Sequence, residues 1–171
     1  NITALHYSGG QLIVGYNDGN IDLITNWEIV NISDIASASI LGDKKINNIF
    51  VDNNLAYVSC PFGIVVIDLG NKEVKETYYL SNDGTITEVF GVHVFDEGLH
   101  TNTDIFLSNK IFAATNKGLF YASKNDNLLD YAVWQNDCQV SLLSKSNQYI
   151  YTLENTNILK IQGFDKKEDG G

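Results

Sequence analysis

The sequence has little positive charge and no long apolar run. Lysine and arginine number 11 against 21 aspartates and glutamates, so the formal net charge is −10. An acidic chain repels phosphate groups, which makes nucleic acids and anionic membrane surfaces poor partners. A solubilising acidic surface is the simpler interpretation of this charge. The longest apolar runs have the length of a strand, so we expect no transmembrane helix and no direct membrane insertion.

Cysteines and catalytic motifs are equally sparse. The two cysteines, Cys60 and Cys138, form no Cys-x-x-Cys pair and match no zinc spacing, and the sequence leaves open whether they are bonded. Neither has an adjacent histidine or basic residue that would lower its pKa, so a nucleophilic role is not expected. No Gly-x-Ser-x-Gly motif, phosphate loop or nucleotide fingerprint occurs. We therefore expect no enzyme, no catalytic residues, no cofactor and no metal.

Methionine is absent altogether, even at the first position. We interpret the chain as a fragment of a longer protein, so the lack of a signal peptide carries no information about secretion. With 171 residues, 44% of them apolar, the fragment is still long enough to bury a core.

What the sequence does contain is a repeated hairpin. The stretches "LIVGYNDGN", "AYVSCPFGI", "IFAATNKGL" and "IYTLENTNI" each indicate strand, turn, strand, and they recur roughly every 40–55 residues. A glycine or asparagine in each turn suits a backbone with positive φ, where a Cβ atom is unfavourable. Four residues before it, Gly15 and its counterparts Ser59 and Ala114 are small, which indicates close approach of a neighbouring sheet. The predicted turn anchors are Gly19, Gly63, Gly118 and Asn157.

Further strands flank each hairpin. "ITALHYS", "INNIFVD", "EVFGVHVF" and "CQVSLLS" precede the four hairpins, and "WEIVNI", "VKETYYL" and "YAVWQ" follow the first three. The nearest candidate for a helix, "NISDIASASI", is interpreted as a connection. Four short strands per repeat are typical of a β-propeller blade. We predict an all-β fold of about four blades of four antiparallel strands, the last blade lacking its outer strand, as part of a larger β-propeller. The domain is residues 1–171, with blades at approximately 1–35, 44–80, 86–135 and 137–164.

A propeller usually has more than four blades, so we expect this piece to belong to a larger one. It should then expose a blade face and unpaired strand edges. Either another copy covers these surfaces, through self-association at the blade edges, or the remaining blades are missing.

Candidate binding residues are few. The third repeat carries an insert, "DEGLHTNTD", whose carboxylates and imidazole could converge on a metal, but the spacing matches no zinc or calcium motif. A solvated polar loop is the favoured interpretation. The residues of this candidate binding loop are Asp96, Glu97, His100 and Asp104.

Other polar and aromatic residues have simple structural explanations. His6 and His93 lie in predicted strands, where a lone histidine is usually structural. "YNDGNID" and "SNDGTITE" resemble parts of calcium loops, but they lack the bidentate glutamate and are first of all turn sequences. Five aromatic residues in the predicted outer strands could stack on a sugar or dock a partner, although packing between blades is favoured. They are Trp27, Tyr78, Tyr79, Tyr131 and Trp134.

Two family resemblances follow from these repeats. "AATNKGLFY" resembles the propeller repeat of two-component regulators. A longer series, "ITALHYSGGQLIVGYNDGNIDLI", "NISDI" and "KKINNIFVDNNLAYVSCPFGIVVIDLGNKEVKETYYL", resembles the N-terminal propeller domain of PorZ-type proteins over residues 1–135. Such proteins are accessory components of type IX secretion in Bacteroidetes.

The resemblance implies a non-enzymatic propeller scaffold of an exported protein at the cell surface or in the periplasm. It would assist type IX secretion and the surface attachment of cargo. Its partners would be other secretion or attachment proteins, with a glycan or lipopolysaccharide as a further candidate. One alternative is the periplasmic ligand-sensing propeller of a two-component regulator that binds an oligosaccharide. Another is a polysaccharide-active enzyme, which would need carboxylates that converge at the ends of inner strands.

Overall fold

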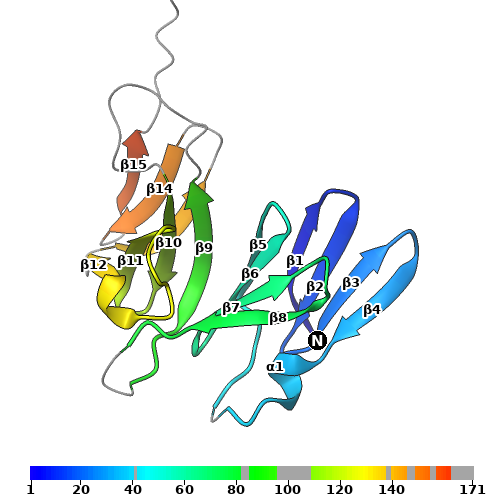
Figure 1. The fold of residues 1–171 in the computed structure, drawn as a ribbon. Coiled ribbons are helices and arrows are strands. Elements are labelled where there is room, and N and C mark those ends of the chain that lie inside the picture. Colours follow the sequence, from blue (N-terminus) through cyan, green and yellow to red (C-terminus); the bar gives the residue numbers. More distant parts are fainter. Residues whose placement is uncertain are drawn as a thin grey trace, which may run out of the picture.

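The structure is a computed structural model, and it describes residues 1–40, 42–81, 85–95, 109–137, 140–145, 149–154 and 157–162. Four antiparallel sheets follow one another along the chain (Figure 1). The first contains β1 (Ile2–Ser8), β2 (Gln11–Tyr16), β3 (Ile21–Thr25) and β4 (Glu28–Ile32). The second contains β5 (Asn48–Asp52), β6 (Leu55–Cys60), β7 (Gly63–Asp68) and β8 (Glu73–Tyr78). The third contains β9 (Val89–Phe95), β10 (Lys110–Thr115), β11 (Gly118–Ser123) and β12 (Gln135–Asp137). The fourth contains β13 (Val140–Lys145), β14 (Tyr149–Glu154) and β15 (Asn157–Gln162).

Within each sheet, strands that are consecutive in the chain are hydrogen-bonded neighbours. The first strand of each sheet contacts the first strand of the next, so β1, β5, β9 and β13 lie side by side. Figure 1 shows the sheets in a row, with the first and fourth at opposite ends. This is the arrangement of propeller blades, and the all-β fold class predicted from the sequence is confirmed.

Apolar side chains fill the spaces between the sheets. Both faces of the second sheet are buried, one against the first sheet and the other against the third. The core between the first two sheets includes Ile13, Ile21, Leu23, Val58, Val65 and Ile67. The core between the second and third includes Tyr57, Ile64, Val66, Val94, Ile111 and Phe120.

Gly15 shows why the repeat needs a small residue before its turn. Ile46, two residues before β5, is fully buried against it. A Cβ atom on Gly15 would lie 2.6 Å from Cγ2 of Ile46. The neighbour that approaches Gly15 closely is thus the segment leading into β5, rather than a strand of the next sheet.

The turns of the second and third hairpins are alike. Gly63 and Gly118 begin β7 and β11, and they pair with Cys60 and Thr115 across two-residue turns. Their φ angles are +146° and +106°. Glycine is required at such angles because a Cβ atom would be strained there.

The first hairpin differs by one residue. Gly19, with φ +86°, lies in a longer turn, which the Tyr16 amide closes by donating to the Asn20 carbonyl at 3.1 Å. Ile21, rather than Asn20, is therefore the counterpart of Ile64 after the turn. Gly19, predicted as the turn anchor equivalent to Gly63, therefore lies one residue before the position that Gly63 occupies, because the turn of the first hairpin is longer.

The connections contain the only two helical turns of the described residues. α1 (Asp34–Ser37) lies within the expected connection between the first two sheets. η1 (Tyr131–Val133) occupies part of "YAVWQ", for which the sequence pattern predicts a strand. The expected strand is wrong for residues 131–134, because β12 begins only at Gln135. Trp134 is buried, and its indole N–H donates to the Leu128 carbonyl at 3.0 Å, so tertiary packing overrides the strand propensity of this segment.

Candidate docking surface

Trp27 is the most exposed large apolar side chain that the structure describes, with 97% of its surface accessible. It lies in the two-residue turn between β3 and β4, where Thr25 pairs with Glu28. Asn26 and Trp27 have φ angles of +50° and +67°. Two positive φ angles define a turn that prefers Asn-Gly, and an L-residue with a bulky side chain is disfavoured there by about 1–2 kcal/mol. Trp27 therefore adds strain to this turn and gains almost no burial.

The first sheet also presents an apolar face to the outside. Strand register places Leu5, Val14, Asp22 and Asn31 in one row across the sheet, and successive residues of a strand point to opposite faces. The opposite face packs on the second sheet. We call the outward side the open face, and its residues are Leu5, Tyr7, Leu12, Val14, Tyr16, Asp22, Ile24, Ile29 and Asn31.

Three apolar side chains of the open face are largely accessible, whereas Val14 at its centre is buried. The exposed fractions are 61% for Leu5, 71% for Tyr7 and 64% for Ile29. An accessible cluster of this kind is typical of a surface that another molecule or another part of the protein covers.

A polar cluster lies within the open face. The Tyr16 hydroxyl donates to Oδ2 of Asp22 at 2.7 Å, and Nδ2 of Asn31 donates to Oδ1 of the same carboxylate at 2.7 Å. The hydrogen bond to the Asp22 carboxylate raises the pKa of Tyr16. Both Asp22 oxygens are thus held in place by neighbouring strands.

A cavity of about 360 Å³ lies at the ends of the second sheet's strands. Phe62, from the turn between β6 and β7, lines it together with Leu80 and Ile86 of the following connection. The Thr87 hydroxyl, also in the lining, already donates to the Leu80 carbonyl at 2.9 Å. None of the described lining residues is charged, so the cavity suits an apolar group better than a charged substrate.

The histidines of the inner strands pack edge to face around one phenylalanine. The ring centroids of His6 and Phe50 are 6.4 Å apart, and those of Phe50 and His93 are 4.8 Å apart. These residues come from β1, β5 and β9, the strands that lie side by side. The contacts agree with a structural role for both histidines.

The five aromatic residues singled out from the sequence have different environments. Tyr78 and Trp134 are buried, with ring centroids 6.1 Å apart, between the second and third sheets. Tyr131 packs against Phe120, with the ring centroids 6.4 Å apart. Tyr79 is 54% exposed, and Trp27 is almost fully exposed. Packing between blades therefore accounts for Tyr78 and Trp134 but not for Trp27.

Cys60 is fully buried on the face of the second sheet that meets the first. Burial raises the pKa of its thiol to about 12, which keeps the sulfur protonated and unreactive at neutral pH. Cys138 lies outside the described residues.

Asp18 and Asp22, in and beside the first Asn-Asp-Gly turn, have different hydrogen-bond partners. Oδ1 of Asp18 accepts the Asn20 amide at 3.1 Å, and this bond lowers the pKa of Asp18. Asp22, by contrast, belongs to the polar cluster with Tyr16 and Asn31. Within the part of the chain that the structure describes, no group of three or more His, Cys, Asp or Glu side chains could hold a metal ion. The candidate loop residues Asp96, Glu97, His100 and Asp104 lie outside that part.

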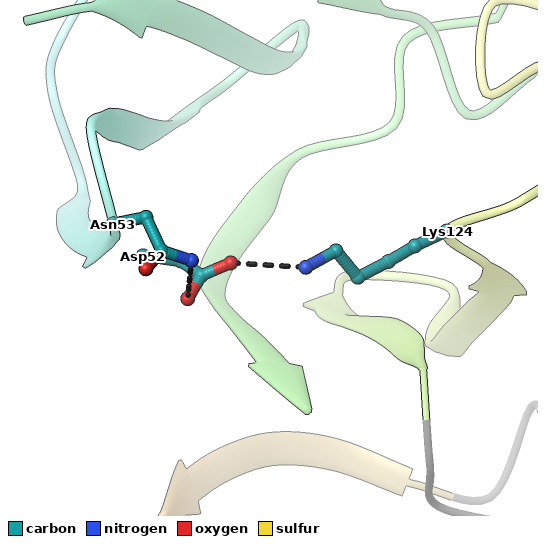
Figure 2. Close-up of polar contacts among 3 residues, drawn as sticks. All are labelled: Asp52, Asn53 and Lys124. Carbon is teal, nitrogen blue, oxygen red and sulfur yellow. Dashed lines mark hydrogen bonds and ion pairs between the residues drawn. The ribbon is translucent and has the colours of Figure 1, made fainter. Parts of the chain in front are cut away.

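An ion pair joins the second and third sheets (Figure 2). Nζ of Lys124, which follows β11, lies 3.0 Å from Oδ2 of Asp52 at the end of β5. Nδ2 of Asn53 donates to the other carboxylate oxygen at 3.2 Å. The two side chains are 22% and 17% exposed. An ion pair in partial contact with water contributes at most about 1 kcal/mol to the stability of the fold, so its main effect is to orient the two chain segments.

Comparison with known families shows to which family this chain belongs. Residues 1–135 match the family described as "TSS9, PorZ, N-terminal beta-propeller domain". The chain belongs to this PorZ propeller family. The match ends at the start of β12, and the fourth sheet lies beyond it.

Solved structures agree with the PorZ fold. PorZ of Porphyromonas gingivalis, described as an essential bacterial surface component of the type IX secretion system, has a TM-score of 0.75 at 22% identity. The alignment covers 95% of this chain and 21% of the PorZ chain, so this chain spans about a fifth of that protein. No curated protein matches the sequence.

Two other propellers align over almost the whole chain. The computationally designed Ika8 protein has a TM-score of 0.60 at 13% identity, with 95% of this chain and 46% of that chain covered. The WD40 propeller domain of Doa1 has a TM-score of 0.57 at 14% identity, with 94% and 50% covered. These likenesses establish the propeller fold. In the described residues of this PorZ propeller, no helix has the length and apolar character that a membrane span requires.

Proposed function

We propose that this PorZ propeller is a non-enzymatic docking scaffold of an exported surface protein. It binds another protein of the type IX secretion or attachment machinery and so assists the surface attachment of cargo. The family match over residues 1–135 supports this proposal. A propeller suits the task because a stiff set of sheets presents many loops at fixed positions.

Trp27 is the side chain we assign as the docking anchor. It is 97% exposed and has a left-handed backbone, so it does not stabilise the fold by burial. Tryptophan is among the residue types most enriched at the centre of protein interfaces, where it becomes buried by the partner. Burial of its indole by a partner protein would supply the stabilisation that the free propeller lacks.

The first experiment compares two variants of the same turn in the full-length protein. Trp27→Gly removes the indole and leaves the preferred Asn-Gly turn, whereas Asn26→Gly keeps the indole and also tolerates positive φ. We expect Trp27→Gly to weaken capture of secretion components by about tenfold or more, with less cargo on the cell surface, and Asn26→Gly to behave as wild type. Equal capture of secretion components by the wild type, Trp27→Gly and Asn26→Gly would refute the assignment of Trp27 as the docking anchor.

The enzyme alternative is not favoured by the described inner strands. β1 ends at Ser8, β5 at Asp52 and β9 at Phe95. The carboxylate of Asp52 is paired with Lys124, so it is poorly placed to act as an acid or base. For the oligosaccharide sensor, a glycan array with the full-length protein is the direct test, and specific binding that survives Trp27→Gly would favour it over protein docking.

A further inference from the structure

The cavity of about 360 Å³ lies at the opposite end of the strands from Trp27. Phe62 lines it from the turn between β6 and β7, at one end of these antiparallel strands, and the turn between β7 and β8 is at the other end. Trp27 lies in the turn of the first sheet that corresponds to the turn between β7 and β8. The cavity and the docking anchor are therefore separate sites.

The cavity has an enclosed side and an accessible rim. Leu80 and Phe62 are 1% and 6% exposed, whereas Tyr79 and Ile86, which line the same cavity, are 54% and 55% exposed. A small molecule is normally buried over most of its surface in its pocket. A rim of exposed apolar side chains suits instead an apolar side chain on the surface of another protein, because that surface covers the rim as well.

A single positive charge lies beside the rim. Nζ of Lys117, in the turn between β10 and β11, donates to the hydroxyl of Thr85, which lines the cavity. An ammonium group has three N–H donors. Within the described part of the chain, no carboxylate forms an ion pair with Lys117. Lys117 is therefore placed to bind an anionic group that lies just outside the cavity.

The nearest carboxylates bind groups of the chain itself. Asp34 lines a smaller cavity of about 80 Å³, which also contacts Phe62, and its Oδ2 accepts a backbone amide of β8 at 3.2 Å. Oε1 of Glu88 accepts a hydrogen bond from Nδ2 of Asn47 at 3.1 Å. An acidic group of a ligand is repelled by both carboxylates and attracted by the ammonium group, so the charges favour one orientation of the ligand.

We propose that this cavity is a second docking site, which binds a peptide segment of a partner protein that has a bulky apolar residue next to an aspartate or glutamate. The apolar side chain fills the cavity, and the carboxylate pairs with Lys117 at the rim. The inference rests on the proposed docking function and adds to it the chemistry of a partner. Contacts at both ends of the strands would let one partner bind more tightly than through Trp27 alone.

Binding of the full-length protein to an array of immobilised short peptides tests this chemistry. The probes contain leucine or phenylalanine next to aspartate. In the matched peptides, asparagine replaces the aspartate or alanine replaces the apolar residue. We expect the wild type to bind the apolar–acidic peptides about fivefold or more tightly than either matched peptide. Equal binding of the aspartate and asparagine peptides would overturn the proposal.

Two pairs of variants locate the binding on the protein. Lys117→Gln should abolish the preference for aspartate over asparagine, whereas Lys75→Gln, at an exposed lysine of β8, should keep it. Ile86→Ser should weaken binding of the apolar peptides by about tenfold. Leu129→Ser, at a side chain that is 58% exposed, should bind as the wild type does. Since all four side chains are exposed, the variants should fold, and wild-type affinity in Ile86→Ser would contradict the proposal.

Two further measurements separate this site from other occupants and from the docking function. Octanoate is the probe for a small amphiphile, and if it binds the wild type more tightly than the peptides do and is lost in Ile86→Ser, the proposal is overturned. Trp27→Gly should leave peptide binding unchanged. Capture of secretion components without any preference among the peptides would refute only the cavity assignment. A preference for the apolar–acidic peptides without such capture would support the cavity assignment and refute docking to the secretion machinery.

Discussion

The same face of two sheets has opposite environments in this protein. Ile67, in the second sheet, is fully buried between blades, whereas its counterpart Ile24 in the first sheet is only half-buried. Both residues are isoleucines in a third strand and belong to equivalent cross-strand rows. What differs is the neighbouring sheet. The comparison shows that an apolar repeat supplies a surface fit for packing, while the presence of a partner decides whether that surface stabilises the fold.

The largest expected effect separates the two isoleucines directly. Ile67→Ala leaves a cavity between two packed sheets and should lower the free energy of unfolding by about 3–4 kcal/mol. Ile24→Ala removes a partly accessible side chain and should cost about 1 kcal/mol in this chain. Urea denaturation of both variants measures the difference. Equal losses would contradict the comparison, and a larger loss for Ile24→Ala in the full-length protein would place a blade on the open face.

A second pair of variants compares the turns of the two sheets. A Cβ atom on Gly63 would collide with the Tyr78 carbonyl oxygen of the adjacent strand, at a φ angle of +146°. Gly10 also has positive φ, at +81°, but a Cβ atom there would have no other atom within 4 Å. We expect Gly63→Ala to destabilise the fold by about 2 kcal/mol or more and Gly10→Ala by about 1 kcal/mol. Thermal unfolding distinguishes them, and similar melting temperatures would argue against the close strand contact.

Alkaline pH should distinguish Cys60 from its counterpart Tyr16. Burial raises the pKa of the Cys60 thiol from 9.0 to about 12, so the folded state holds this proton more tightly than the unfolded state. The resulting stability is fully present below pH 9 and is lost as the pH rises toward 12. At pH 10 the wild type should have lost about 1 kcal/mol more than Cys60→Ala, relative to pH 8. The pKa of Tyr16 is raised by Asp22 above its ordinary value of 10.0, so any contribution from Tyr16 is lost only above that pH and should disappear in Tyr16→Phe.

Denaturation curves at pH 8 and pH 10 provide this measurement. Tyr78, whose pKa is raised mainly by burial, is present in all variants and so cancels in the comparison. Parallel loss of stability in the wild type and in Cys60→Ala would show that the thiol does not ionise on unfolding in this range.

The smallest expected effect has the opposite sign. Trp27→Gly restores the residue type that suits the second position of this turn and should stabilise the isolated propeller by about 0.5–1 kcal/mol. Asn26→Gly should change stability less, because asparagine already tolerates a left-handed backbone. A loss of stability in Trp27→Gly would indicate that the indole packs within the chain, which would weaken its assignment to a docking role.

Strands and turns could be predicted because they depend on residues that are close together in the sequence. Alternating apolar residues and the turn glycines indicated the order of the strands and the sheet architecture. The greater length of the turn around Gly19 could not be predicted, because glycine and asparagine alternate there and several turn lengths fit the same residues. "YAVWQ" was misjudged for a different reason. Its residues favour a strand, but burial of Trp134 beside Tyr78 keeps the segment out of β12 until Gln135.

The candidate surface was less accessible to sequence reasoning. Trp27 and Trp134 are the same residue type near equivalent outer strands, yet one is almost fully exposed and the other is 6% exposed. No local pattern distinguishes them. The backbone strain of Trp27 could have been suspected only from its place after Asn26 in a two-residue turn.

The sequence by itself determined the strands, their order and most of their turns, because alternation of side chains and the needs of a left-handed backbone are local properties. The tertiary structure alone decided which faces are buried, which aromatic residues are accessible and where Tyr16, Asp22 and Asn31 meet. Those features depend on contacts between residues on separate strands or separate sheets, and a face of a sheet gains stability only when another surface excludes water from it.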